Sequence, residues 1–68
     1  MNEKVLIVED EPQMLRILGL TLEKHGYRIA AAQTAAAARA QIQASLPDLI
    51  VLDVMLPDTS GLDLCQEL

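Results

Sequence analysis

The chain has 68 residues, which is enough for one small domain with one modest hydrophobic core. Apolar residues make up 51% of it, but Tyr27 is the only aromatic residue, so the core must consist of aliphatic side chains and alanine. The formal net charge is −5 and every charged residue after Arg39 is acidic, which argues against nucleic acid binding by this segment. A single cysteine, Cys65, excludes an internal disulfide and fits a reducing compartment.

The first residues, MNEKVLIVEDE, lack the basic opening and the long apolar core of a signal peptide. No apolar run approaches the roughly 18 residues that a membrane span requires. We therefore expect a soluble, cytoplasmic protein that does not interact with a membrane.

The first predicted elements are a strand over residues 4–8 and a helix from Pro12 to about His25. The strand is predicted from an apolar run, and three acids follow it directly: Glu9, Asp10 and Glu11. Proline suits the first turn of a helix, where its missing N–H costs nothing. The spacing of Leu15, Leu18, Gly19 and Leu22 gives the helix one apolar face, and Gly26 can end it in a left-handed conformation. His25 is interpreted as a helix-end residue because the chain has no second histidine to share a metal.

The middle of the chain predicts a weaker strand and an alanine-rich helix. Residues 28–32 are assigned to a strand mainly by their position, since Ile29 is their only β-branched residue. Thr34 can cap a helix from Ala35 to about Ser45 that places Ala38 and Ile42 on one face. Small residues would let this helix lie close to a sheet.

Residues 49–61, LIVLDVMLPDTSG, predict a third strand and the loop after it. The continuous apolar run 49–52 is typical of a parallel strand covered on both faces, and Asp53 ends it. Pro57 and Gly61 are turn formers, and Ser60 can cap a last helix that the end of the chain cuts short.

The predicted order is β-α-β-α-β-α, which favours parallel strands joined by right-handed crossovers. If the first strand lies between the second and the third, the two helices cover opposite faces and Glu9, Asp10 and Asp53 converge at a topological switch point. Neighbouring strands lie ~4.8 Å apart, so three carboxylates there repel one another unless a proton or a cation intervenes. A site built only of oxygen ligands is typical of Mg²⁺.

Two motifs at a specific separation resemble the receiver domain of two-component response regulators. VLIVEDEP at residues 5–12 matches that family's first strand and acidic pair, and DVMLPDTSG at residues 53–61 matches its phosphoacceptor loop. The resemblance implies a flavodoxin-like α/β fold, here truncated to three parallel strands in the order 2-1-3 with helices on both faces. Residues 1–68 would form the N-terminal portion of a receiver: strands 1–3, helices 1–2 and the start of helix 3.

The resemblance also implies a function in signalling rather than an enzyme. Asp53 would accept a phosphoryl group from a sensor histidine kinase, and the output would be control of transcription through a domain absent from this chain. Asp10 and Asp53 would bind Mg²⁺ through their side chains, Met55 through its backbone carbonyl, and Glu9 through a water. Independently of the family, a divalent ion would neutralise the oxygens of a phosphoryl group approaching a carboxylate. Glu11 is interpreted as a helix-start acid.

The chain departs from a complete receiver in two respects. The family places a threonine or serine hydroxyl after its fourth strand and a lysine after its fifth, and the chain has no lysine after Asp53. Thr59 and Ser60 lie in the adjoining loop, where turn and capping roles suit them. Without the later strands, residues 49–52 would form an exposed apolar edge, so we expect a truncated or split piece that self-associates or is poorly stable alone.

Three alternatives compete with the phosphoacceptor interpretation. A phosphohydrolase with an aspartyl-phosphate intermediate would need a second aspartate two residues after the first, where this chain has Met55. A receiver-like fragment could act as a protein-interaction module without phosphorylation. Flavin or nucleotide binding would need a phosphate-binding loop after the first strand, where the acids 9–11 would repel anions instead.

Overall fold

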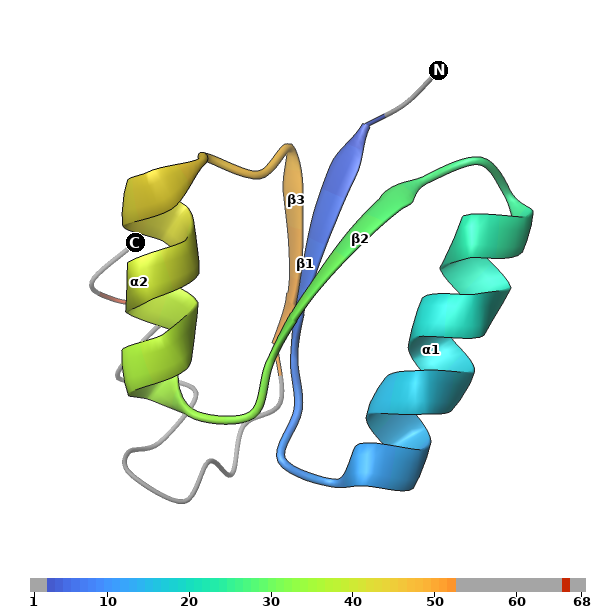
Figure 1. The fold of residues 1–68 in the computed structure, drawn as a ribbon, viewed down its shortest axis with the longest axis horizontal. Helices are drawn as coiled ribbons and strands as arrows, with labels where there is room; N and C mark the ends of the chain where they lie inside the picture. The colour runs from blue at the N-terminus through green and yellow to red at the C-terminus, as the bar shows by residue number, and fades with distance from the viewer. Residues whose placement is uncertain (1–2, 53–65, 67–68) are drawn as a thin grey trace.

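The computed structural model describes residues 3–52 and Gln66. A single parallel sheet with the strand order β2-β1-β3 lies between two helices, α1 on one face and α2 on the other (Figure 1). The elements in chain order are β1 (Lys4–Val8), α1 (Pro12–Lys24), β2 (Arg28–Ala32), α2 (Ala35–Ala44) and β3 (Leu49–Leu52). The predicted strand order and the placement of the helices are confirmed. The helix expected from Ser60 lies outside the described residues apart from Gln66.

Helix α1 begins and ends where local chemistry predicts. Glu11 is its N-cap, and Pro12 occupies the first turn. At the other end, the imidazole Nδ1 of His25 lies 2.9 Å from the carbonyl oxygen of Thr21, one of the last free carbonyls of the helix. Gly26 then adopts φ 91°, a left-handed conformation that glycine tolerates without a steric penalty. His25 is therefore a helix-end residue, as predicted.

Helix α2 begins at a side-chain cap and packs through its alanines. The Thr34 hydroxyl oxygen accepts a hydrogen bond from the backbone N–H of Ala37 at 3.1 Å. Ala35 and Ala38 are fully buried, and Ile42 packs at the margin of the same cluster. Because alanine ends at Cβ, the helix backbone can lie close to the sheet.

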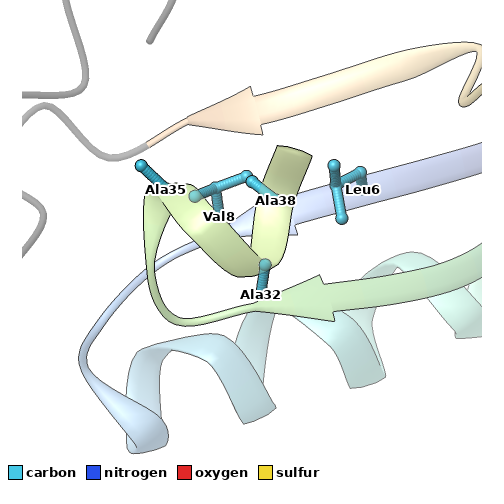
Figure 2. Packing of buried hydrophobic residues seen from close by; sticks show 5 residues of the cluster. All are labelled: Leu6, Val8, Ala32, Ala35 and Ala38. Atoms are coloured by element: carbon cyan, nitrogen blue, oxygen red, sulfur yellow. The ribbon is translucent and has the colours of Figure 1, made fainter. Parts of the chain in front are cut away.

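Strand β1 forms the centre of the core. Its four apolar residues, Val5 to Val8, have at most 1% of their surface exposed, so β1 is covered on both faces. On the α2 face, Leu6 and Val8 pack with three alanines, Ala32, Ala35 and Ala38 (Figure 2). On the α1 face, Gly19 lies against β2, where an added Cβ would be 3.8 Å from the Ile29 side chain. The expected aliphatic, alanine-based core is confirmed.

Strand β3 is less covered than its apolar sequence suggests. Leu49 is 54% exposed, and Ile50, Val51 and Leu52 are half-buried. The expectation of cover on both faces therefore holds for β1 and is wrong for Leu49, where the expected exposed edge is found instead. The reason is geometric: β3 lies at the edge of the described sheet, and α1 packs against β1 and β2. Neither described helix has the length and apolar character needed to cross a membrane.

Candidate functional site

The C-terminal ends of the parallel strands lie together at one end of the sheet, its carboxyl end. Helices α1 and α2 both begin beside this carboxyl end, at the bottom of Figure 1. The register pairs Val8 of β1 with Leu52 of β3, so the two strands end level with each other. Ligands of open parallel sheets bind outside such carboxyl ends, and the place where the chain crosses to opposite faces is the favoured one.

Glu9 and Asp10 follow β1 at the carboxyl end of the sheet. The Glu9 backbone N–H donates a 3.0 Å hydrogen bond to the carbonyl oxygen of Ala32, which extends the β1–β2 pairing by one residue. The Glu9 side chain is half-buried, and its Oε2 accepts a long, 3.4 Å bond from the backbone N–H of Glu11. Asp10 is exposed. These contacts hold Glu9 at the carboxyl end of the sheet and leave the Asp10 carboxylate accessible to solvent.

Glu11, the third acid, serves the helix. Its Oε1 accepts a 3.2 Å hydrogen bond from the backbone N–H of Gln13, one of the donors that a helix N-terminus leaves without an intrahelical partner. The interpretation of Glu11 as a helix-start acid is confirmed. Of the three acids, Glu11 therefore caps α1, and the other two follow the end of β1.

The oxygen ligands available at the carboxyl end of the sheet suit a hard divalent cation. Glu9 and Asp10 supply carboxylate oxygens, which are the ligands that Mg²⁺ takes in proteins. Asp53 and Met55, the other two predicted ligands, lie outside the described residues. Within residues 3–52 and 66, no group of three or more histidine, cysteine or acidic side chains is gathered closely enough to hold a metal. The described pair thus fits part of a magnesium site.

Asp48 has a structural role that the sequence analysis missed. Its Oδ2 accepts a 2.8 Å hydrogen bond from the backbone N–H of Lys4, and its own backbone N–H donates a 2.8 Å bond to the Lys4 carbonyl oxygen. The two residues are 44 positions apart, so no local pattern connects them. The only sequence signal is an acid directly before an apolar strand.

Comparisons with known proteins identify the family. The family model described as the response regulator receiver domain matches residues 5–68. The alkaline phosphatase synthesis transcriptional regulatory protein PhoP of Bacillus subtilis is 41% identical over 68 residues, which cover 100% of this chain and 28% of PhoP. The transcriptional regulatory protein KdpE of Mycobacterium tuberculosis is 44% identical over 59 residues, covering 87% of this chain and 26% of KdpE.

Solved structures show the same similarity. The non-phosphorylated HemR receiver domain from Leptospira biflexa superimposes with a TM-score of 0.90 at 35% identity, covering 97% of this chain and 53% of that one. The response regulator TrrA from Thermotoga maritima, in complex with Mg²⁺ and BeF, gives 0.91 at 32% identity, covering 96% and 56%. The chain therefore belongs to the response regulator receiver domain family. It spans about a quarter of the curated relatives and about half of these solved chains.

Proposed function

We propose that this receiver accepts a phosphoryl group on Asp53 in a Mg²⁺-dependent reaction. The observation that carries the proposal is the pairing of Val8 with Leu52. Glu9 and Asp10 are the next residues after Val8, and Asp53 is the next residue after Leu52. An acid pair and the proposed phosphoacceptor thus directly follow two strands that end level with each other.

The chemistry requires acids on both strands. A carboxylate that attacks a phosphoryl group approaches an anion, so charge must be neutralised before the two can meet. Mg²⁺ supplies that neutralisation when bound. In the proposal Asp10 and Asp53 bind the ion directly, Met55 binds it through its backbone carbonyl, and Glu9 holds one of its waters. The half-buried Glu9, anchored through its backbone to β2, would orient that water.

The relatives support the signalling context. TrrA was crystallised with Mg²⁺ and BeF, and PhoP and KdpE are named as transcriptional regulatory proteins. We accordingly propose a sensor histidine kinase as the phosphoryl donor, the cytoplasm as the location of this receiver and control of transcription as the output. In this role the domain is a switch that carries a phosphoryl group, and not a hydrolase that turns over a substrate.

Intact-mass spectrometry tests the proposal. The chain is incubated with a small phosphodonor, with and without Mg²⁺, beside the Asp53→Asn variant. The expected result is an adduct of about 80 Da, one phosphoryl group, on the wild-type chain with Mg²⁺ only. Asp58→Asn is the matched control and should still form the adduct. If no adduct forms on any variant, the protein-interaction module without phosphorylation becomes the better account.

We further propose that β3 mediates self-association with a second copy of this chain. β3 is a short apolar strand at the edge of the described sheet, and its first residue, Leu49, is 54% exposed. Such an edge offers backbone donors and acceptors to another strand. Sedimentation at increasing concentration should show a dimer that Leu49→Lys disrupts. Leu46→Lys, at a 79% exposed residue outside the strand, is the control and should leave the dimer intact. A monomer at all concentrations would refute the proposal.

A further inference from the structure

Two hydrogen bonds join the N-terminal ends of β1 and β3, at the other end of the sheet from Glu9 and Asp10. Asp48 precedes β3, and Lys4 is the first residue of β1. The Lys4 N–H donates to Asp48 Oδ2 and the Asp48 N–H donates to the Lys4 carbonyl oxygen, both at 2.8 Å. The Lys4 ammonium adds a longer, 3.3 Å bond to the Ser45 carbonyl oxygen. We call the pair of 2.8 Å bonds between Lys4 and Asp48 the Asp48 clamp.

The apolar side chains within the two strands do not by themselves fix the register. Alternating strands resist slipping because a shift of one residue moves their apolar side chains to the wrong face. β1 reads VLIV from Val5 to Val8 and β3 reads LIVL, so either strand is apolar on both faces. A shift of one residue would still set apolar side chains against three of the four, but it would place an acid, Asp48 or Asp53, opposite a fully buried end residue of β1. The polar residues at the strand ends must therefore set the register.

The Asp48 clamp supplies a polar constraint that only one register satisfies. It sets Val5 opposite Leu49 as the first pair, and the ladder then places Val8 opposite Leu52. A slip of one residue would displace the end of β3 by ~3.3 Å relative to the end of β1. Metal coordination tolerates far less, since Mg²⁺ requires ligand oxygens at about 2.0–2.1 Å.

We propose that Asp48 is a positioning residue whose carboxylate fixes the register of β3 against β1, and thereby sets the end of β3 level with the end of β1, where Glu9 and Asp10 follow. The proposal rests on the proposed function only for its consequence in phosphorylation. Its structural content, the register itself, stands separately. Asp48 acts from the far end of the strands and does not touch the phosphoryl group.

Three variants of the whole chain test the proposal. Asp48→Ala removes the acceptor, Asp48→Asn keeps an amide oxygen at the same place, and Glu23→Ala removes an exposed acid from α1 as the charge-matched control. Misplacement by about 1 Å can cost about 100-fold in rate, so Asp48→Ala should slow phosphoryl adduct formation at least about tenfold and raise the Mg²⁺ concentration that gives the half-maximal rate. Asp48→Asn and Glu23→Ala should stay within about twofold of wild type. Mere loss of stability would lower the fraction of chain that reacts without changing that Mg²⁺ concentration.

Two nuclear magnetic resonance measurements keep the inference testable if Asp48→Ala does not fold. In the wild-type chain, the Lys4 amide should exchange with solvent much more slowly than the Glu3 amide, and cross-strand contacts should pair Val8 with Leu52. A rapidly exchanging Lys4 amide, or an Asp48→Ala variant with unchanged rate and unchanged pairing, would overturn the proposal. If the wild-type chain forms no adduct but Asp48→Ala shifts or loses the Val8–Leu52 pairing, the proposed function fails and the register role stands.

Discussion

Replacing Leu6 with alanine tests the account of the core in a single residue. Leu6 is 1% exposed at the centre of β1, and its neighbours in the α2-side cluster include the alanines Ala32 and Ala38. Leucine-to-alanine substitutions in cores cost about 2–5 kcal/mol, more where the surroundings cannot collapse into the cavity. Alanine side chains have no rotamers with which to fill a void. We therefore expect a loss in the upper part of this range, about 3–5 kcal/mol.

This loss is large against the total stability of so short a chain. At about 0.05–0.15 kcal/mol per residue, its 68 residues yield a free energy of unfolding of about 3–10 kcal/mol. Leu6→Ala should therefore lower the melting temperature by more than about 12 °C or leave the chain unfolded. The matched control is Leu20→Ala on the outer face of α1, where leucine is 58% exposed. It should change the free energy of unfolding by less than about 0.5 kcal/mol.

Chemical denaturation followed by circular dichroism at the helix band provides both values. Equal losses for Leu6→Ala and Leu20→Ala would refute the assignment of Leu6 to the core. A loss for Leu6→Ala below about 1 kcal/mol would refute the argument that its alanine neighbours cannot close the cavity.

The remaining predictions concern the helices and are checked by the same denaturation measurement. Gly19→Ala should raise the free energy of unfolding by up to about 1 kcal/mol, because the added Cβ would lie 3.8 Å from the nearest atom of β2, an ordinary contact, while alanine favours the helix. Gly26→Ala should lower it by about 1–2 kcal/mol because φ is 91° there; a gain at Gly26 would contradict the helix end described. Thr34→Ala should cost about 1 kcal/mol by removing the α2 cap, and Thr34→Asn should restore most of it. Ala38→Leu should cost about 1–3 kcal/mol by overpacking the buried helix face, whereas Ala37→Leu, on the exposed face, should be nearly neutral.

Most of the fold could be predicted because local signals and the global topology agree. Pro12 and Gly26 mark the two ends of α1, and the apolar run 5–8 marks β1; the structure places all three as predicted. The assignment of β2 is more instructive. Its residues favour a strand only weakly, yet they pair with β1 from Arg28 to Ala32, and Ala32 is buried in the α2-side cluster. Tertiary context determines that element more than propensity does.

Other features could not be predicted from local patterns. An apolar run predicts a strand but does not show which face of it a helix covers, so the run 49–52 alone wrongly predicted cover for Leu49. The Asp48 clamp joins residues 44 positions apart and depends on the register that it helps to fix. At the candidate site, the role of Glu11 follows from helix capping and is confirmed. The roles of Asp53 and Met55 stay predictions, since both lie outside the described residues.

The central claim is that the acids after β1 and β3 share one magnesium ion. Its most direct test is a Mg²⁺ titration of the ¹⁵N-labelled chain, followed through the backbone amide signals of all residues. The account predicts saturable shifts confined to the signals of Glu9, Asp10 and the residues after Leu52 in sequence, and their loss in Asp10→Asn. Shifts that do not saturate, or that centre on the N-terminal ends of the strands near Asp48, would contradict it.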